Sequence, residues 1–145
     1  MSYRYGISRE QTMLLPESVE DYVGGDNAVR VIDAFVEGLD VVGLGFESEI
    51  EEGPGAPAYH PKALLKLYVY GYLNRIRSSR ELEKATRRNL EVIWLLARLM
   101  PDHWTINEFR RVHRRRFKAV FRQPMWSAAT WGYLGLTWWP SMEPI

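Results

Sequence analysis

Cysteine is absent from this 145-residue chain, which excludes disulfide frameworks, thiolate zinc sites and cysteine nucleophiles. The three histidines, His60, His103 and His113, are scattered and lack partners at the spacing of metal ligands, so we expect surface or capping roles and no metal site. No apolar run approaches the length of a membrane span, and the N-terminus has no apolar signal core. One cytoplasmic domain without membrane contact is therefore expected.

Motifs for catalysis are also missing. No glycine-rich phosphate loop follows a strand-like run, and no Ser/His/Asp grouping is evident. Glu49, Glu51 and Glu52 are close together, but they fall in residues 43–58, a Gly-, Pro- and Glu-rich stretch that is typical of a loop. A hard cation needs several converging oxygens, so these carboxylates more simply keep the loop soluble. The sequence predicts no catalytic residue and no cofactor.

Charge is present in an ordinary amount but is unevenly distributed. Residues 1–61 hold three arginines and twelve carboxylates, a net charge of −9, whereas residues 62–122 hold sixteen lysines and arginines and five carboxylates, a net charge of +11. Such segregation predicts a surface that binds a polyanion, with nucleic acid as the favoured partner. The alternative is that the two halves neutralise each other within one fold.

The middle of the chain predicts a buried helix followed by a basic one. Residues 63–76 are apolar on nearly every side, which is typical of a helix at the centre of a fold. Its alternating tyrosines at 68, 70 and 72 would also fit a strand, but the run is too long for one. Ser78 and Glu81 then have the spacing of a capping box, which starts a new helix after a tight turn. Helix, short turn and basic helix is the arrangement of helix-turn-helix DNA readers.

The hydrophobic periodicity predicts an all-α fold of about five helices, over residues 27–38, 61–76, 79–89, 90–100 and 105–122. Asp26 is the expected N-cap of the first helix, and Thr105 with Glu108 repeats the capping-box spacing at the last. In that last helix the apolar side chains share one face, which we expect to point inward: Ile106, Phe109, Val112, Phe117, Val120 and Phe121.

The two ends of the chain look less regular. Residues 1–17 are expected to form a flexible lead-in whose Leu14, Leu15 and Pro16 dock on the core, followed by a turn capped by Ser18 and Asp21. Residues 124–145 have no clear period and are expected to form an irregular tail, so the predicted domain is 1–123.

Two neighbouring basic helices carry the functional prediction. Phosphate contact needs cations at helical intervals, and base reading needs side chains that project from one helix into the major groove. Cations on single exposed helices are commonly only solvated, but here one of the two helices follows the helix-turn-helix pattern. The residues predicted to bind DNA are Arg75, Arg77, Arg80, Lys84, Arg87, Arg88, Arg110, Arg111, Arg114, Arg115 and Lys118.

Seven short segments occur in a defined order: 14–16 (LLP), 29–33 (VRVID), 59–61 (YHP), 64–72 (LLKLYVYGY), 78–83 (SSRELE), 88–95 (RNLEVIWL) and 105–111 (TINEFRR). In this order they resemble the N-terminal domain of bacterial insertion-sequence transposases of the DDE type, the family usually called transposase InsH N-terminal. The likeness covers roughly residues 10–123, with Glu108 where the family more often has Asp.

The resemblance implies a helical domain that binds the terminal repeats of the element. In such transposases a following RNase H-like domain supplies three carboxylates that hold two metal ions for strand transfer. The first of these carboxylates sits in a motif resembling V-A-I-D-G-[ST], which this sequence does not contain. The chain is therefore interpreted as a transposase truncated before its catalytic domain, without an enzymatic centre of its own.

The tail offers a reason for the missing motif. Residues 124–145 contain four of the six tryptophans and a single charge. If Ser141 uses a TCN codon, back-translating Thr137 to Pro144 and dropping two bases gives [LMV]-V-A-[LFIV]-[DNHY]-G-[TA], which includes the catalytic motif. We interpret the tail as out-of-frame translation after a slip near Gln123.

Three functions remain open on the sequence alone. The first is a DNA-binding fragment that competes with an intact transposase for the ends of the element. The second is a subunit of an active transposase that is completed by frameshifting or by a partner. The third is a helical protein-interaction module whose basic face meets an acidic surface. The expected partner is double-stranded DNA at the terminal repeats, with a second copy of the chain or a full-length transposase as further candidates.

Overall fold

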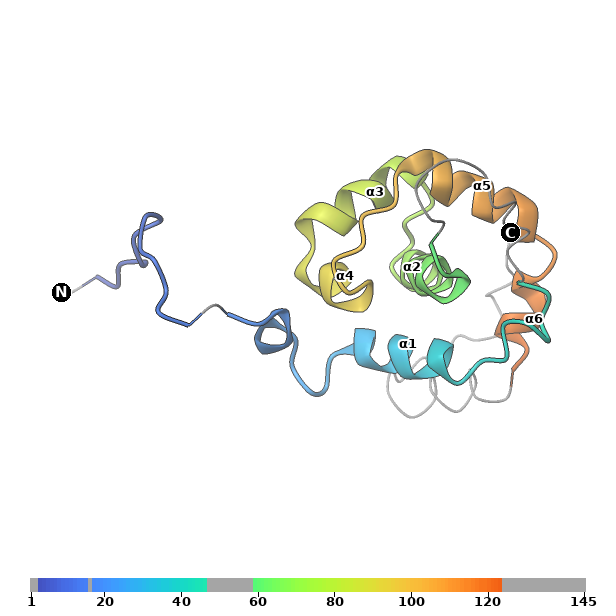
Figure 1. Ribbon diagram of the computed structural model, residues 1–145, viewed down its shortest axis with the longest axis horizontal. Coiled ribbons are helices and arrows are strands. Elements are labelled where there is room, and N and C mark those ends of the chain that lie inside the picture. Colours follow the sequence, from blue (N-terminus) through green and yellow to red (C-terminus); the bar gives the residue numbers. More distant parts are fainter. Residues whose placement is uncertain (1–2, 16, 47–58, 124–145) are drawn as a thin grey trace.

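The computed structural model describes residues 3–15, 17–46 and 59–123. These residues form six α-helices and one 3-10 helix and contain no strand, which confirms the all-α prediction. In Figure 1 helix α2 (Pro61–Leu73) is seen nearly end-on, with α1 (Ala28–Glu37), α3 (Ser79–Arg88), α4 (Leu90–Leu95) and α5 (His103–His113) around it. The 3-10 helix η1 (Val19–Tyr22) precedes α1, and α6 (Phe117–Phe121) follows α5. The predicted loop at 47–58 and the predicted tail lie outside the described residues.

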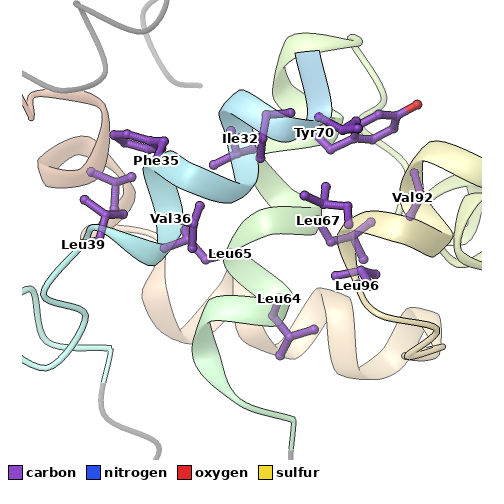
Figure 2. Close-up of a cluster of buried hydrophobic side chains, with 14 of the residues drawn as sticks. Ile32, Phe35, Val36, Leu39, Leu64, Leu65, Leu67, Tyr70, Val92 and Leu96 are labelled. Atoms are coloured by element: carbon purple, nitrogen blue, oxygen red, sulfur yellow. The ribbon is translucent and has the colours of Figure 1, made fainter. Parts of the chain in front are cut away.

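Helix α2 is central because its apolar side chains point in all directions, so each face needs cover. Pro61 stands at the first helical position, and Nδ1 of His60 caps the helix by accepting the backbone N–H of Lys62 at 3.2 Å. Figure 2 shows the core cluster that α2 forms with α1 and α4. The buried residues of α2 are Leu64, Leu65, Leu67, Val69, Tyr70 and Gly71.

A tight turn ends α2 three residues earlier than predicted and leads directly into α3. The backbone N–H of Ile76 donates to the Gly71 carbonyl at 2.8 Å, and that of Arg75 donates to the Tyr72 carbonyl at 3.4 Å. With Arg75 in the left-handed region (φ 59°), this is a Schellman motif. The Ser78 hydroxyl then accepts the Glu81 N–H at 3.4 Å, so Ser78 is the N-cap of α3 as predicted. The Glu81 side chain pairs with Lys84 instead of completing the predicted capping box.

Gly71 allows α2 and α3 to approach closely. A Cβ atom added at this position would lie 3.0 Å from the Ile76 carbonyl oxygen and 3.0 Å from a methyl group of Leu82 in α3. A backbone carbonyl in a hydrogen-bonded turn cannot move aside easily. The absence of a side chain at Gly71 therefore helps to place α3 on the central helix.

Helix α1 covers another face of α2 and is also held by charge. Nζ of Lys66 lies 2.6 Å from Asp33 and 2.7 Å from Glu37, and only 12% of the Lys66 side chain is exposed. The side-chain oxygen of Asn27 caps α1 by accepting the Val29 N–H at 3.0 Å, so the prediction of Asp26 as the cap is wrong. Asn27 takes this role because it is the last residue with extended backbone before the helix.

Leu14 and Leu15 of the lead-in do not dock on the core as predicted, and Pro16 lies outside the described residues. Leu14 is 99% exposed and Leu15 is 79% exposed, and Figure 1 shows this segment running away from the helices. The first helical element of the chain is η1, where Ser18 and Asp21 form the expected capping box. Glu20 of η1 then accepts a hydrogen bond from the Trp94 indole at 2.5 Å and pairs with Arg30.

Helix α4 is shorter than the predicted 90–100 because its C-terminus forms a second Schellman turn. The N–H of Arg98 donates to the Ile93 carbonyl at 2.9 Å, while Ala97 and Arg98 both have left-handed backbones (φ 49° and 68°). Leu95 is consequently the last helical residue.

The predicted helix over 105–122 is divided into α5 and α6. It starts earlier, because Asp102 caps α5 by accepting the Thr105 N–H at 2.8 Å, so the predicted Thr105 cap is wrong. Between the two helices the Arg116 N–H donates to the His113 carbonyl at 2.9 Å, a tighter three-residue spacing. Like charges four residues apart, as in Arg110 with Arg114, disfavour a regular helix here. Val112, predicted to point inward, is 50% exposed.

Candidate nucleic-acid interface

Basic side chains line an open groove along α5, α6 and the turn between them. The groove has a volume of about 1090 Å³ and is lined in part by Tyr68 of the central helix. No carboxylate lines it within the part of the chain that the structure describes. We call it the α5–α6 groove, and its lining residues are Tyr68, Asn107, Arg110, Arg111, Val112, Arg114, Arg115, Arg116, Phe117 and Lys118.

A second basic surface lies on α3, which we call the α3 surface and define by Arg80, Lys84, Arg87 and Arg88. All four residues are exposed, and they recur three or four positions apart on the helix. Beside them is a depression of about 890 Å³ that Arg75 and Arg77 of the preceding turn also line. Unlike the α5–α6 groove, this depression has carboxylates in its wall, from Glu81 and Glu91.

The α3 surface is partly neutralised by ion pairs within the helix. Nζ of Lys84 lies 3.3 Å from a carboxylate oxygen of Glu81, and a guanidinium nitrogen of Arg87 lies 3.6 Å from Glu83. Exposed pairs of this kind contribute little to stability, but they lower the net charge that a phosphate would meet. Among the described residues, Arg80 and Arg88 have no carboxylate partner.

The α5–α6 groove retains more of its charge. Arg111 is held by Glu108, whose Oε2 accepts its Nε–H at 3.1 Å, and this contact lowers the pKa of the Glu108 carboxyl. Arg114, Arg115 and Lys118 are exposed and have no carboxylate partner in the described ranges. The groove therefore presents uncompensated positive charge.

Arg110 joins the two basic surfaces. Its Nη1–H donates to the backbone carbonyl of Arg77 at 2.6 Å, and its guanidinium carbon lies 5.8 Å from the centre of the Tyr68 ring. Although Arg110 was predicted to bind DNA, it is half-buried, and its Nε has no acceptor within the described residues. Part of its role is therefore to fix α5 against the α2–α3 turn.

His113 supports the turn between α5 and α6 from inside. Its ring lies 5.0 Å from that of Phe46 and 4.7 Å from that of Phe109, and its Nδ1 faces Nη1 of Arg116 at 2.8 Å. Burial, together with the Arg116 charge, lowers the pKa of His113. The neutral imidazole is therefore favoured, and it can accept the Arg116 N–H. The surface or capping role expected for this histidine is wrong, since its side chain is buried.

Sequence reasoning missed three polar residues of the α5–α6 groove: Tyr68, Asn107 and Arg116. The sequence indicates only that Tyr68 belongs to the apolar central helix, and no periodicity indicates that one tyrosine of that helix reaches the groove. Arg116 continues the basic run that was recognised, so the charge pattern alone could have included it. Of the eleven predicted residues, the α5–α6 groove gathers Arg110, Arg111, Arg114, Arg115 and Lys118, while the other six belong to α3 and the turn before it.

Metal-binding groups and membrane-spanning helices are both absent from the described residues. Within the described ranges, no group of three or more His, Asp or Glu side chains is arranged to hold a metal ion. Glu49, Glu51 and Glu52 fall outside those ranges. In the same described part of the chain, no helix is long and apolar enough to cross a membrane.

Comparison with known proteins identifies the family. Residues 17–112 match the family described as "Transposase domain (DUF772)", and this segment runs from the residue before the Ser18 cap through α1, α2, α3, α4 and almost all of α5. No curated protein and no solved structure matches the chain. The matched segment covers well over half of the chain and includes the α3 surface and the first part of the α5–α6 groove. The chain therefore belongs to the transposase domain family DUF772.

Proposed function

We propose that this domain binds double-stranded DNA through the α3 surface and the α5–α6 groove, and that it recognises the ends of an insertion element for a transposase. The observation that carries the proposal is the set of cations without carboxylate partners on neighbouring elements of a transposase-family domain. A polyanion whose phosphates recur at regular intervals is the ligand that such a surface fits. We propose that the eleven lysines and arginines predicted from the sequence, from Arg75 to Lys118, contact the DNA.

The two surfaces suit different parts of a DNA duplex. Helix α3 follows a short turn from the central helix, as the reading helix of a helix-turn-helix does, and its exposed residues are long enough to reach base edges in the major groove. The α5–α6 groove carries fewer carboxylates and more unpaired charge, which suits sequence-independent phosphate contact. Arg110 links α5 to the turn before α3, and we expect both surfaces to engage one duplex.

The direct test is binding to a fluorescent duplex followed by anisotropy over a range of salt concentrations. We expect affinity to fall steeply with salt, with a log–log slope of roughly −0.9 for each phosphate that a Lys or Arg neutralises. A duplex with the terminal repeat of the element should bind more tightly than a random duplex at the same salt concentration. Absence of binding to any duplex at low salt would overturn the proposal.

A helical protein-interaction module is the main competing function, because the basic surfaces would also fit an acidic protein. The two functions differ in the partner that displaces the ligand. If phosphate spacing matters, an acidic polypeptide should displace bound duplex DNA poorly. If only charge matters, the polypeptide should displace it as well as unlabelled DNA does at the same concentration of negative charge.

Strand chemistry is not part of the proposed function. The V-A-I-D-G-[ST] motif does not occur in the sequence, so we expect no nicked or joined product when the chain and element-end DNA are incubated with Mg²⁺ or Mn²⁺. If a second polypeptide supplies catalysis, cleavage should appear only when that polypeptide is added. Product formed by this chain alone would contradict the assignment.

A further inference from the structure

Tyr68 is a hydroxyl-bearing residue that lines the α5–α6 groove. It belongs to the central helix α2, and its ring is stacked on Phe117 of α6, with 3.8 Å between ring centres and 9° between ring planes. The Arg110 guanidinium lies by the same ring, at 5.8 Å from its centre. The ring is thus fixed by its neighbours, and Tyr68 is among the residues that line the groove.

The hydroxyl of Tyr68 is a hydrogen-bond donor without an acceptor in the described part of the chain. Burial raises the pKa of this phenol, and the nearby charges of Arg110 and Arg114 only partly oppose that effect. The group is therefore protonated at neutral pH. Tyrosine hydroxyls in partly buried sites usually find a partner, so an acceptor from outside the chain is the natural complement.

The surroundings define the chemistry of that acceptor. Arg114 and Arg110 bring positive charge close to the hydroxyl, Asn107 adds an amide, and no carboxylate of the described residues lines the groove. A neutral acceptor would not use the two guanidinium groups. An oxyanion would use them and the hydroxyl together, and hydrogen bonds to a charged partner are the stronger kind.

We propose that one phosphate group of the bound DNA sits over Tyr68, accepting the hydroxyl hydrogen bond while Arg114 and Arg110 neutralise its charge. This inference rests on the proposed function and adds a residue and a role to it. The same chemistry has two sources in a duplex, an internal phosphodiester and a terminal phosphate monoester. The groove is open along α5 and α6, so it admits either.

The salt dependence separates the neutral contact from the charged ones. Tyr68→Phe removes only the hydroxyl and keeps the stacked ring, so we expect affinity to fall about five- to tenfold at every salt concentration. The log–log slope should stay constant, because a neutral donor releases no counterion. Arg114→Ala should instead reduce the slope by roughly 0.9.

Tyr72→Phe is the matched control. Tyr72 lies one turn further along α2 and packs on Phe121 of α6 at 4.5 Å between ring centres, but it does not line the groove. Removing its hydroxyl should leave both affinity and salt slope as in the unmodified protein. Thermal melting of each variant confirms that the fold is retained, and Arg114→Ala, an exposed surface change, provides a second measurement independent of the aromatic packing.

The experiment uses the full chain and random-sequence duplexes with either a 5′-hydroxyl or a 5′-phosphate end. Loss of affinity in Tyr68→Phe on both duplexes supports an internal phosphodiester, and loss only on the 5′-phosphorylated duplex supports a terminal phosphate. In the first case, a methylphosphonate placed at each internal position of a terminal-repeat duplex in turn should abolish the Tyr68→Phe effect at one position, because that sequence fixes the register of the protein. Equal affinity of Tyr68→Phe and the unmodified protein on both duplexes would overturn the inference while leaving the proposed function intact. Only failure of the unmodified protein to bind any duplex would remove both.

Discussion

The α3 surface and the α5–α6 groove are both basic, yet they differ in how many of their basic side chains are already paired with carboxylates. On α3, Lys84 and Arg87 already have carboxylate partners on the same helix. In the α5–α6 groove, Glu108 holds Arg111, while Arg114, Arg115 and Lys118 have no carboxylate partner in the described residues. Counting basic residues therefore does not rank two surfaces, because the charge that a phosphate meets depends on what is already paired.

Under the proposed function, this difference also predicts two kinds of DNA contact. A surface with mixed charges gains little from non-specific attraction, but its carboxylates can accept hydrogen bonds from base amino groups, as Glu and Asp do with cytosine. A surface with unpaired cations attracts any duplex. We therefore expect the α5–α6 groove to set affinity and the α3 surface to set preference among sequences.

The largest expected effect comes from removing unpaired charge. The triple variant Arg114→Ala, Arg115→Ala and Lys118→Ala should flatten the log–log salt dependence by up to about 2.7, or roughly 0.9 for each contact. The matched triple on α3 replaces Arg80, Lys84 and Arg88 by Ala. It should flatten the slope less, because Glu81 already partly neutralises Lys84.

Anisotropy titrations of both triples on terminal-repeat and random duplexes check this ordering. The α5–α6 triple variant should lower the affinity for both duplexes by the same factor. The α3 triple variant should reduce the ratio of the affinity for the terminal repeat to the affinity for the random duplex. A larger loss of slope from the α3 triple would reverse the comparison. Surface changes of this kind are expected to alter the free energy of unfolding by no more than about 0.5 kcal/mol each.

Gly71→Val tests whether the position of α3 matters for its role. The added side chain would press on the Ile76 carbonyl and on Leu82, each 3.0 Å from the Cβ position. Overpacking of this kind costs about 1–3 kcal/mol, which corresponds to a melting temperature lower by roughly 2–4 °C per kcal/mol. If the fold survives, preference for the terminal repeat should fall while the salt slope persists. Retention of both stability and preference would show that α3 does not need this close approach.

His113 should make the α5–α6 turn sensitive to acid. The pKa of His113 in the fold is lowered by burial and by Arg116, so the unfolded chain binds a proton more readily. The stabilisation is fully present above the unfolded value of about 6.5 and is lost as the pH falls through the region below it. One proton limits the change to about 1.4 kcal/mol per pH unit.

Thermal melting between pH 7 and pH 5 measures this effect. The only charged group that faces the His113 ring within the described residues is Arg116, while Phe46 and Phe109 supply the apolar contacts. His113→Gln keeps an uncharged acceptor, so its stability should vary less over this range than that of the unmodified protein. His60 and His103 remain in both proteins and provide a common background. Identical pH profiles would exclude His113 as the sensitive group.

The smallest expected effect comes from making the α3 surface more like the α5–α6 groove. Glu81→Gln removes the partner of Lys84, so affinity for any duplex should rise about two- to threefold and the salt slope should become slightly steeper. The free energy of unfolding should fall by less than about 1 kcal/mol, because only an exposed ion pair and a favourable interaction of the Glu81 charge with the helix N-terminus are lost. An unchanged affinity would show that Lys84 does not contact DNA.

Hydrophobic periodicity and capping patterns predicted most of the helices. They were wrong where two neighbouring residues could both serve as the N-cap. The all-apolar stretch predicted α2, and Ser78 predicted the start of α3. Asp26 and Asn27 are both good caps, and only the backbone conformation decides between them. The ends of α2 and α4 could not be predicted, because Arg75, Ala97 and Arg98 adopt left-handed conformations that their residue types rarely favour.

The candidate site was predictable in composition but not in arrangement. The basic runs gave the cations of both surfaces, since charge spacing follows the helical period. The approach of Tyr68 to α6 joins residues 49 positions apart, and only tertiary packing decides which tyrosine of α2 meets Phe117. For the same reason, the hydrogen bond from Arg110 to the Arg77 carbonyl could not be predicted from the sequence, because the other arginines of that run are exposed.

If both surfaces bind one duplex as proposed, the hydrogen bond between Arg110 and the Arg77 carbonyl makes the domain a rigid bivalent ligand. Once one surface is on the duplex, the other meets the same duplex at a high effective concentration, and no linker entropy dilutes it. Avidity then depends on the length of DNA that both surfaces can span together. A series of progressively shorter duplexes should therefore lose affinity in a single step, at the length where only one surface can still bind.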